Sequence, residues 1–248
     1  MNAAAAAFAI APALALGSFL NVVVARVPER RSLLRPPSSC GSCRQEIMWR
    51  DNVPVLSFVL LRGRCRHCGA SISLAYPLVE ALTAALVVAC VAVFGATPEA
   101  ALAAGFCAVL VTLSVIDLGH RIVPDRIVLP VAAVALVAHT AIDPSLEWTV
   151  AALVAAGALF VVVLAYPTGL GLGDVKLALL LGAVLGAATS VALMIGFLAA
   201  LVPALVLAVR HGSAARKLAV PLVPFLSFGA VVALFVGERI LDAYVALF

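Results

Sequence analysis

Long apolar runs constrain this chain more than any other feature of its sequence. A membrane-spanning helix needs about 20 predominantly apolar residues, and about eight segments approach that length and character. They cover residues 3–25, 76–94, 99–116, 127–142, 149–166, 175–188, 190–209 and 219–236. Of the 248 residues, 65% are hydrophobic and 11% charged, against roughly 45–50% and about 25% in soluble domains. The sequence therefore predicts an all-α polytopic membrane protein with about eight transmembrane helices.

The first apolar run also has features of a signal peptide. Small residues near its end, in "APALALGS", offer a possible cleavage site. However, no Lys or Arg precedes the run, and further spans follow it. We expect residues 1–25 to be retained as the first transmembrane helix.

The positive charges fall into one alternating set of loops. Fifteen of the 16 Lys and Arg residues lie within residues 26–75, 117–126, 167–176 and 210–217. In the loops expected on the other side, the only charged residues are Glu99, Asp143 and Glu147. Because positive charge marks the cytoplasmic side, we expect these basic loops in the cytoplasm and the N-terminus outside. The net charge of +4 then reflects topology, and no nucleic-acid partner is expected.

Residues 26–75 form the one predicted loop large enough to fold outside lipid. It contains "CGSC" at 40–43 and "CRHC" at 65–68, two Cys-x-x-Cys pairs separated by 21 residues. This spacing is typical of a tetrathiolate zinc site, with a pair of disulfides as the alternative. A cytoplasmic location favours reduced thiols. We expect a structural zinc ion, which folds the loop and takes no part in hydrolysis, held by Cys40, Cys43, Cys65 and Cys68.

Two aspartates lie at predicted helix ends on the cytoplasmic side. Asp117 directly follows the span 99–116, and Asp174 follows a glycine-rich turn that includes Gly171 and Gly173. Ionisable groups at the membrane are costly and suggest function. Two carboxyls brought together share a proton, so that one can activate water while the other protonates a leaving group. The pair therefore indicates aspartic peptidase chemistry, with the glycines allowing an extended peptide to approach Asp174.

Each of these aspartates has a competing interpretation. For Asp174 the alternative is a role only as the cap of the helix that follows it. Asp125 competes with Asp117 for the second position in the pair, although an N-cap role at the next helix suits Asp125 well. Glu80 is a further intramembrane acid without an assigned role. A nucleotide-binding loop is disfavoured because the Gly-Lys-Ser/Thr ending is missing.

Several motifs together resemble those of the bacterial type IV prepilin leader peptidases, the bifunctional kind that also N-methylates its product. The matching stretches are "GSFLNVVVARVP" at 17–28, "DNVPVLSFVLLRGR" at 51–64, "ISLAYPLVE" at 72–80, "DLGHRIVPD" at 117–125 and "GLGLGDVKL" at 169–177. Two departures are visible. Gly41 stands where the family usually has proline, and "VPLVPFLSFGA" at 220–230 replaces a pattern richer in glycine.

The resemblance implies a catalytic pair of Asp117 and Asp174, with Lys176 close to Asp174 as in the family. A snorkelling side chain is the alternative for Lys176. It further implies removal of a basic leader from type IV prepilins or pseudopilins at the cytoplasmic face of the bacterial inner membrane. The new N-terminal residue, often Phe, would then receive a methyl group from S-adenosylmethionine.

The sequence indicates the methyl-donor site less clearly than the peptidase site. Residues 26–75 are the methyltransferase-associated loop and residues 76–248 the peptidase bundle in this interpretation. Asn21, Arg26 and Glu80 are weak candidates for contacting the donor. A peptidase without methyl transfer remains an alternative, and a proton-coupled transporter is another. The sequence does not identify the physiological pilin.

Overall fold

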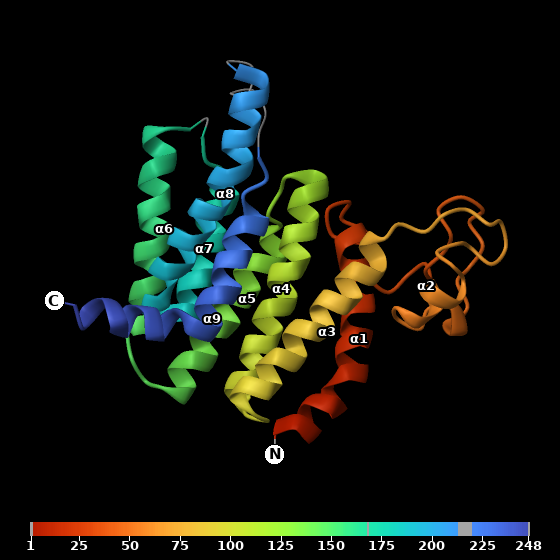
Figure 1. Ribbon diagram of the computed structural model, residues 1–248, viewed down its shortest axis with the longest axis horizontal. Coiled ribbons are helices and arrows are strands. Elements are labelled where there is room, and N and C mark those ends of the chain that lie inside the picture. The colour runs from red at the N-terminus through yellow and green to blue at the C-terminus, as the bar shows by residue number, and fades with distance from the viewer. Residues whose placement is uncertain (1, 168, 213–219, 248) are drawn as a thin grey trace. The chain divides into compact units, whose positions relative to one another are not determined.

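Helices dominate the computed structural model, which describes residues 2–167, 169–212 and 220–247 (Figure 1). Within these residues, seven helical stretches are long and apolar enough to cross a bilayer. The predicted all-α membrane fold is confirmed. Arg216 and Lys217, which contributed to the predicted charge asymmetry, lie outside the described residues.

One of the seven stretches is a continuous run of 40 residues, Leu172–His211. At about 1.5 Å per residue it would measure roughly 60 Å, twice the thickness of a bilayer core. The run contains two helices, α7 (Leu172–Leu185) and α8 (Thr189–His211), separated by the 3₁₀ turn η2 (Gly186–Ala188). Gly186 adopts a φ of +54° there, a conformation that glycine takes without strain. These helices correspond to the predicted spans 175–188 and 190–209.

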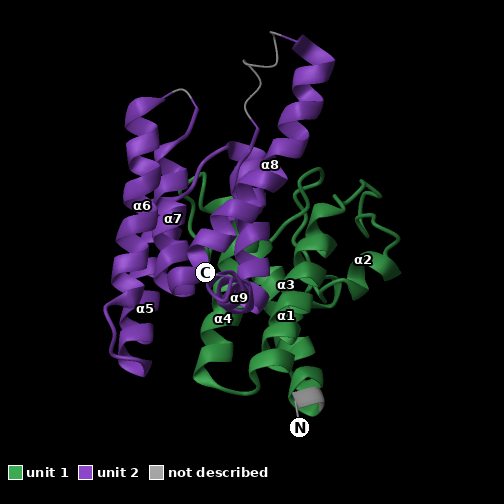
Figure 2. Cartoon of the chain, turned by 60° about the vertical axis from the view of Figure 1, so that its left-hand side comes forward, with its two compact units in different colours: residues 1–112 green, residues 113–248 purple. Residues whose placement is uncertain are grey.

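The chain divides into two compact units, residues 1–112 and 113–248 (Figure 2). The first unit begins with α1 (Asn2–Arg26) and continues through a long loop that holds η1 (Trp49–Asp51) and α2 (Leu56–Leu60). It ends with α3 (Ala75–Phe94) and the first part of α4 (Pro98–His120). The loop runs over residues 27–74, and its regular structure is limited to these two short helices and isolated β-bridges.

Helices α1 and α3 pack closely because a glycine faces the contact. A Cβ atom added at Gly17 would lie 2.6 Å from the Cα atom of Glu80. Small residues of this kind let membrane helices approach each other. Cys90 of α3 and Cys107 of α4 are both fully buried, and their sulfurs lie 3.9 Å apart.

The second unit is built around α7. Its other helices are α5 (Asp125–Ile142), α6 (Glu147–Ala165), α8 and α9 (Val223–Val245). Helix α7 contacts all four of them, and Leu177, Leu180 and Leu181 have no exposed surface. The backbone of α6 at Ala152 comes so close to α7 that Gly182 has no room for a side chain. The unit therefore holds the N-terminus of α7, where Asp174 lies, in a packed setting.

Candidate active site and metal centre

The two aspartate motifs meet within the second unit. Asp117 lies in the last turn of α4 and Asp174 in the first turn of α7. The connection from α4 to α5 passes so close to α7 that a Cβ atom added at Gly173 would lie 3.0 Å from Cγ2 of Val123. This contact brings the end of α4, with Asp117, and the start of α7, with Asp174, into one region of the unit. Residues 57 positions apart in the sequence therefore share one acidic site.

Asp117 is buried, with 7% of its surface exposed. Its Oδ2 accepts a hydrogen bond of 3.2 Å from the backbone N–H of Val223, the first residue of α9. The first N–H groups of a helix have no partner inside the helix, so the carboxylate satisfies one of them. Sequence reasoning missed this contact. Pro224 in the first turn of α9 signals a helix start, but nothing local identifies which carboxylate that start meets.

Asp174 caps its own helix and is half-buried. Its Oδ2 accepts a hydrogen bond of 3.1 Å from the backbone N–H of Gly171, the residue before α7. The N-cap residue of α7 is Gly171, and Asp174 is the third residue of the helix. Asp174 therefore supports the cap from within the first turn, and the bond fixes one oxygen of its carboxyl. Gly171 and Gly173 both belong to this turn, and only Gly173 is crowded by the neighbouring loop.

Asp125 takes a different role from the N-cap that its position suggested. The cap position of α5 belongs to Pro124, and Asp125 is the first residue of the helix. Its carboxylate forms an ion pair of 2.5 Å with the Nζ atom of Lys176. Lys176 thus links the start of α7 to the start of α5. The ion pair ties together the two segments that carry the acidic motifs.

The four predicted metal ligands converge in the first unit. The sulfurs of Cys40, Cys43, Cys65 and Cys68 all lie within 4.8 Å of one another. The Cys40 and Cys68 sulfurs are 3.8 Å apart. Four thiolates around zinc at about 2.3 Å have sulfurs about 3.8 Å apart. The cluster therefore fits a tetrahedral zinc ion.

The two cysteine pairs sit on turns with the same hydrogen-bond pattern. Cys40 N–H donates to Gln45 O at 2.9 Å, and Cys65 N–H donates to Ala70 O at 2.8 Å. The residue four positions after the first cysteine of each pair, Arg44 or Gly69, has a positive φ. In the first turn, the backbone N–H groups of Cys43 and Ser42 lower the pKa of the Cys40 thiol to about 6. Such a thiol is readily available as the thiolate that binds metal.

An ion pair joins the second cysteine turn to η1. The guanidinium of Arg66 contacts both carboxylate oxygens of Asp51, at 2.6 to 3.0 Å. This hydrogen bonding from Arg66 holds the pKa of the Asp51 carboxyl below its usual value. The fork geometry fixes orientation as well as distance.

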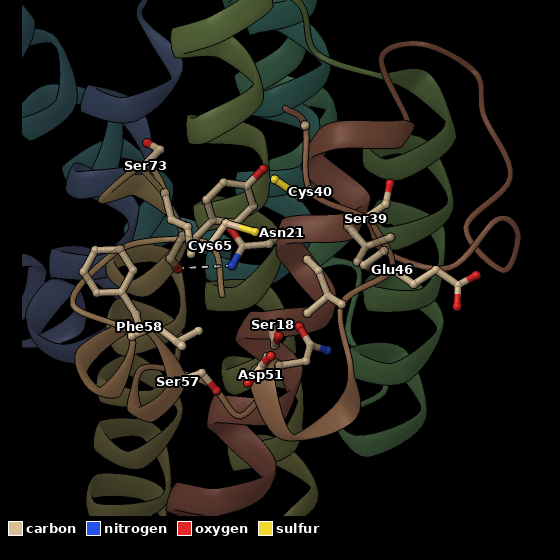
Figure 3. Close-up of a pocket in the computed structure, with 18 of the residues that line it drawn as sticks. Ser18, Asn21, Ser39, Cys40, Glu46, Asp51, Ser57, Phe58, Cys65 and Ser73 are labelled. Carbon is tan, nitrogen blue, oxygen red and sulfur yellow. Dashed lines mark hydrogen bonds between the residues drawn. The ribbon is translucent and has the colours of Figure 1, made fainter. Parts of the chain in front are cut away.

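A cavity of about 550 Å³ lies between α1, the cysteine loop and the start of α3 (Figure 3). Ligand sites commonly have volumes of roughly 300–1,000 Å³. Asn21, Arg26 and Glu80, the three candidates for contacting a cofactor, all line it. Figure 3 draws Ser18 and Asn21 from α1, Ser57 and Phe58 from α2, and Cys40 and Cys65 from the two cysteine turns among the lining residues.

Each of the three candidates also holds part of the cavity wall. The guanidinium of Arg26 donates to the carbonyl oxygens of Ser32, Leu33 and Pro36 at 2.9, 3.3 and 2.6 Å. Asn21 Nδ2 donates to Tyr76 O at 3.1 Å. Glu80, only 8% exposed, accepts a hydrogen bond of 2.7 Å from Val55 N–H at Oε2.

Comparisons with known proteins match both units. Residues 12–94 match the family described as Bacterial Peptidase A24 N-terminal domain, and residues 104–209 match the Type IV leader peptidase family. No solved structure matches the chain at the significance applied.

The relatives that the chain matches include several named prepilin leader peptidase/N-methyltransferase. The protein of Bacillus subtilis is 35% identical over 242 residues, covering 94% of this chain and 95% of its own. That of Burkholderia pseudomallei (strain 1026b) is 35% identical over 266 residues, covering 93% and 85%. That of Myxococcus xanthus is 47% identical over 125 residues, covering 50% and 37%.

Proposed function

The chain belongs to the A24 family of type IV leader peptidases, and from this membership we propose that it removes leaders from prepilins or pseudopilins and N-methylates the products. We assign the cleavage to Asp117 and Asp174. The observation that carries this assignment is the meeting of the two acidic motifs at the ends of α4 and α7. Backbone N–H groups hold one oxygen of each carboxyl, which fixes the carboxyls in orientation.

The proposed cleavage needs only the two carboxyls and a water molecule. One aspartate accepts a proton as water attacks the scissile carbonyl carbon, while the protonated partner donates to the carbonyl oxygen. Collapse of this tetrahedral species breaks the C–N bond, and the leaving nitrogen takes up a proton. Gly171 and Gly173 leave the backbone next to Asp174 without side chains at those two positions, so that an extended substrate can approach.

The test of this assignment is leader removal by purified protein in detergent. We expect Asp117→Asn to abolish cleavage, because the substitution keeps the volume and removes the titratable group. Asp125→Asn serves as the matched control and should retain activity. Cleavage by Asp117→Asn combined with complete loss in Asp125→Asn would reverse the assignment.

We assign the methyl-donor site to the cavity of the first unit. S-adenosylmethionine, when bound, supplies an electrophilic methyl group to an amine. The cavity has a suitable volume, and the buried carboxyl of Glu80 can stabilise a positively charged group within it. Asn21 and Arg26 hold the start of α3 and the turn at 32–36 around it.

Calorimetric titration with S-adenosylmethionine tests this site without relying on turnover. We expect Glu80→Gln to weaken binding at least tenfold, while Glu99→Gln, outside the cavity lining, leaves it unchanged. Equal affinity in both variants would place the donor elsewhere.

We further propose that the N-terminus is outside and that the acidic site faces the cytoplasm of the bacterial inner membrane. The asymmetric distribution of Lys and Arg supports this orientation. A prepilin with a basic leader in the cytoplasm would then meet Asp117 and Asp174 at the membrane surface. Reporter fusions within 95–97 and 210–212 should report opposite sides of the membrane. Reports from the same side would overturn the topology.

A further inference from the structure

The cysteine loop contains one short apolar segment, residues 53–61, that includes α2. Leu56, Val59 and Leu60 follow an i, i+3, i+4 spacing and lie on one face of α2, and Leu60 is 71% exposed. The other face contributes Ser57 and Phe58 to the cavity lining. A cluster of exposed aliphatic side chains marks a surface that contacts something other than water.

This segment lies alongside the membrane-spanning part of α1 and α3, below their loop ends. Val55 N–H is bound by the carboxylate of Glu80, five residues into α3, and Glu80 packs against Gly17. Gly17 is nine residues before the end of α1 at Arg26, or about 13 Å at the rise of an α-helix. Val55, at the entry to α2, is therefore bound at a level within the candidate spans of α1 and α3.

A second contact supports the same depth. Asn52 and Pro54 border a small hollow of about 290 Å³ together with Ala15 and Phe19 of α1. Ala15 lies two residues further from the helix end than Gly17. The entry to the apolar segment thus runs along a stretch of α1 that is apolar and long enough to cross a bilayer.

Several backbone N–H groups of the segment are hydrogen-bonded within it, which lowers the cost of a hydrocarbon environment. Ser57 N–H donates to Val53 O at 3.0 Å, Val59 N–H to Val55 O at 3.1 Å, and Leu61 N–H to Ser57 O at 2.9 Å. The N–H of Val55 has no partner within the turn, and Glu80 supplies one. In this arrangement Val55 adopts a φ of +58°, which is strained for a β-branched residue.

The flanks of the segment have the composition of membrane-interface anchors. Trp49, which is 84% exposed, and Arg50 precede it, and the exposed Arg62 and Arg64 follow it. Tryptophan concentrates at the membrane–water interface, and arginines near the surface are attracted to anionic head groups. The apolar centre of the segment suits the acyl chains of a bilayer, and the Trp and Arg residues at its ends suit the interface and the head groups.

We propose that residues 53–61 dip into the bilayer and return, with Leu56, Val59 and Leu60 of α2 in contact with lipid acyl chains. This inference rests on the hydrogen bond from Val55 to Glu80 of α3 and on the hollow that Asn52 and Pro54 share with α1, and not on the proposed activity. Its consequence is that the cavity behind Ser57 and Phe58 opens at the level of the membrane surface.

Quenching of tryptophan fluorescence by lipids with brominated acyl chains tests the proposal. The full chain is placed in phosphatidylcholine–phosphatidylglycerol nanodiscs, with Trp49→Phe and Trp148→Phe removing the native tryptophans. A single tryptophan is then introduced by Leu60→Trp. A lipid-exposed position in α6 (Leu153→Trp) and an exposed position in the first cysteine turn (Ser42→Trp) serve as the two controls.

We expect the tryptophan at position 60 to lose at least half as much emission as that at position 153, and the one at position 42 to lose almost none. Zinc content and leader cleavage identify variants that remain folded, and Val59→Trp replaces Leu60→Trp if the latter is not. Quenching at position 60 no greater than at position 42 overturns the proposal. Emission that shifts only when a mature pilin peptide is added also overturns it, in favour of a protein-docking face.

Discussion

The acidic site and the cysteine-rich site are held in place by different kinds of interaction. Asp117 and Asp174 lie at the ends of long helices, and α7 is buried by four neighbouring helices. The cysteine loop has little regular structure. It is held by the cluster of four sulfurs, by the hydrogen bonds of Arg26 to three carbonyl oxygens, and by the hydrogen bond of Val55 N–H to Glu80. A site built on packing survives the loss of a ligand, whereas a site built on a few polar contacts and a metal does not. The two should therefore fail under different treatments.

The largest effect is expected from removing one carboxyl of the acidic site, which should stop cleavage and leave methylation unchanged. Asp174→Asn should slow leader cleavage by roughly 10³-fold or more, in line with the usual contribution of general acid–base groups. The same variant should methylate a synthetic mature peptide with a free N-terminal Phe at the parent rate. Mass spectrometry of both reactions, with purified protein in detergent, gives the comparison. Loss of both activities in a folded protein would show that the sites are not separate.

The reciprocal change removes two sulfurs from the cysteine-rich site. Cys40→Ser combined with Cys43→Ser should abolish stoichiometric zinc, because small metal sites lose their structure without their ligands. Methylation should fall at least tenfold, while cleavage falls no more than two- to threefold because α7 and its neighbours lie in the other unit. Metal analysis gives the zinc content of the variant, and the methylation and cleavage assays give its two activities. Unchanged zinc content in the double variant would refute the ligand assignment.

A smaller effect is expected from crowding the acidic site. A Cβ atom at Gly173 would lie 3.0 and 3.1 Å from Cγ2 and Cβ of Val123, whereas a Cβ at Gly171 would lie an ordinary 3.6 Å from Asp174 Oδ2. Gly173→Ala should thus displace the loop by a few tenths of an ångström and lower cleavage about tenfold, since catalytic geometry tolerates little displacement. Gly171→Ala should stay within twofold. Equal rates in the two variants would show that the contact with Val123 does not position the carboxyls.

The smallest effect is expected at the ion pair between Asp125 and Lys176. Both side chains are substantially exposed, and such pairs contribute on the order of 0.2–1 kcal/mol. Asp125→Asn retains a hydrogen-bond acceptor for Lys176, so cleavage should fall less than about fivefold. Initial rates and thermal stability are the two measurements. Complete loss of cleavage with unchanged stability would place Asp125 in the chemistry.

The features that the sequence predicted are those encoded by local spacing. Apolar run length identified the spans, and the Cys-x-x-Cys spacing identified a set of sulfurs that the structure brings together. The bond from Val223 to Asp117 joins residues 106 apart, and the pair Cys90 and Cys107 joins two helices. Such contacts depend on the register and crossing of packed helices, which no local pattern records.

Two interpretations failed or fell short for identifiable reasons. Asp125 looked like an N-cap, but Pro124 takes the cap position and the carboxylate pairs with Lys176 51 residues away. The apolar segment at 53–61 was too short to stand out as a span. Its bond to Glu80, the contact of Glu80 with Gly17, and the hollow shared with Ala15 and Phe19 reveal how far along α1 it lies.

The identical turns at Cys40–Cys43 and Cys65–Cys68 have a consequence for chain entropy. A metal bound to all four sulfurs would close a loop around the 21 residues between them, much as a covalent cross-link does. Closing a loop of that length restricts the unfolded chain by on the order of 3 kcal/mol. The apolar segment lies within this loop, so the ion would fasten both ends of a stretch too short to anchor itself. Where thiols are kept reduced, a metal clip is a way to obtain that restraint without a disulfide.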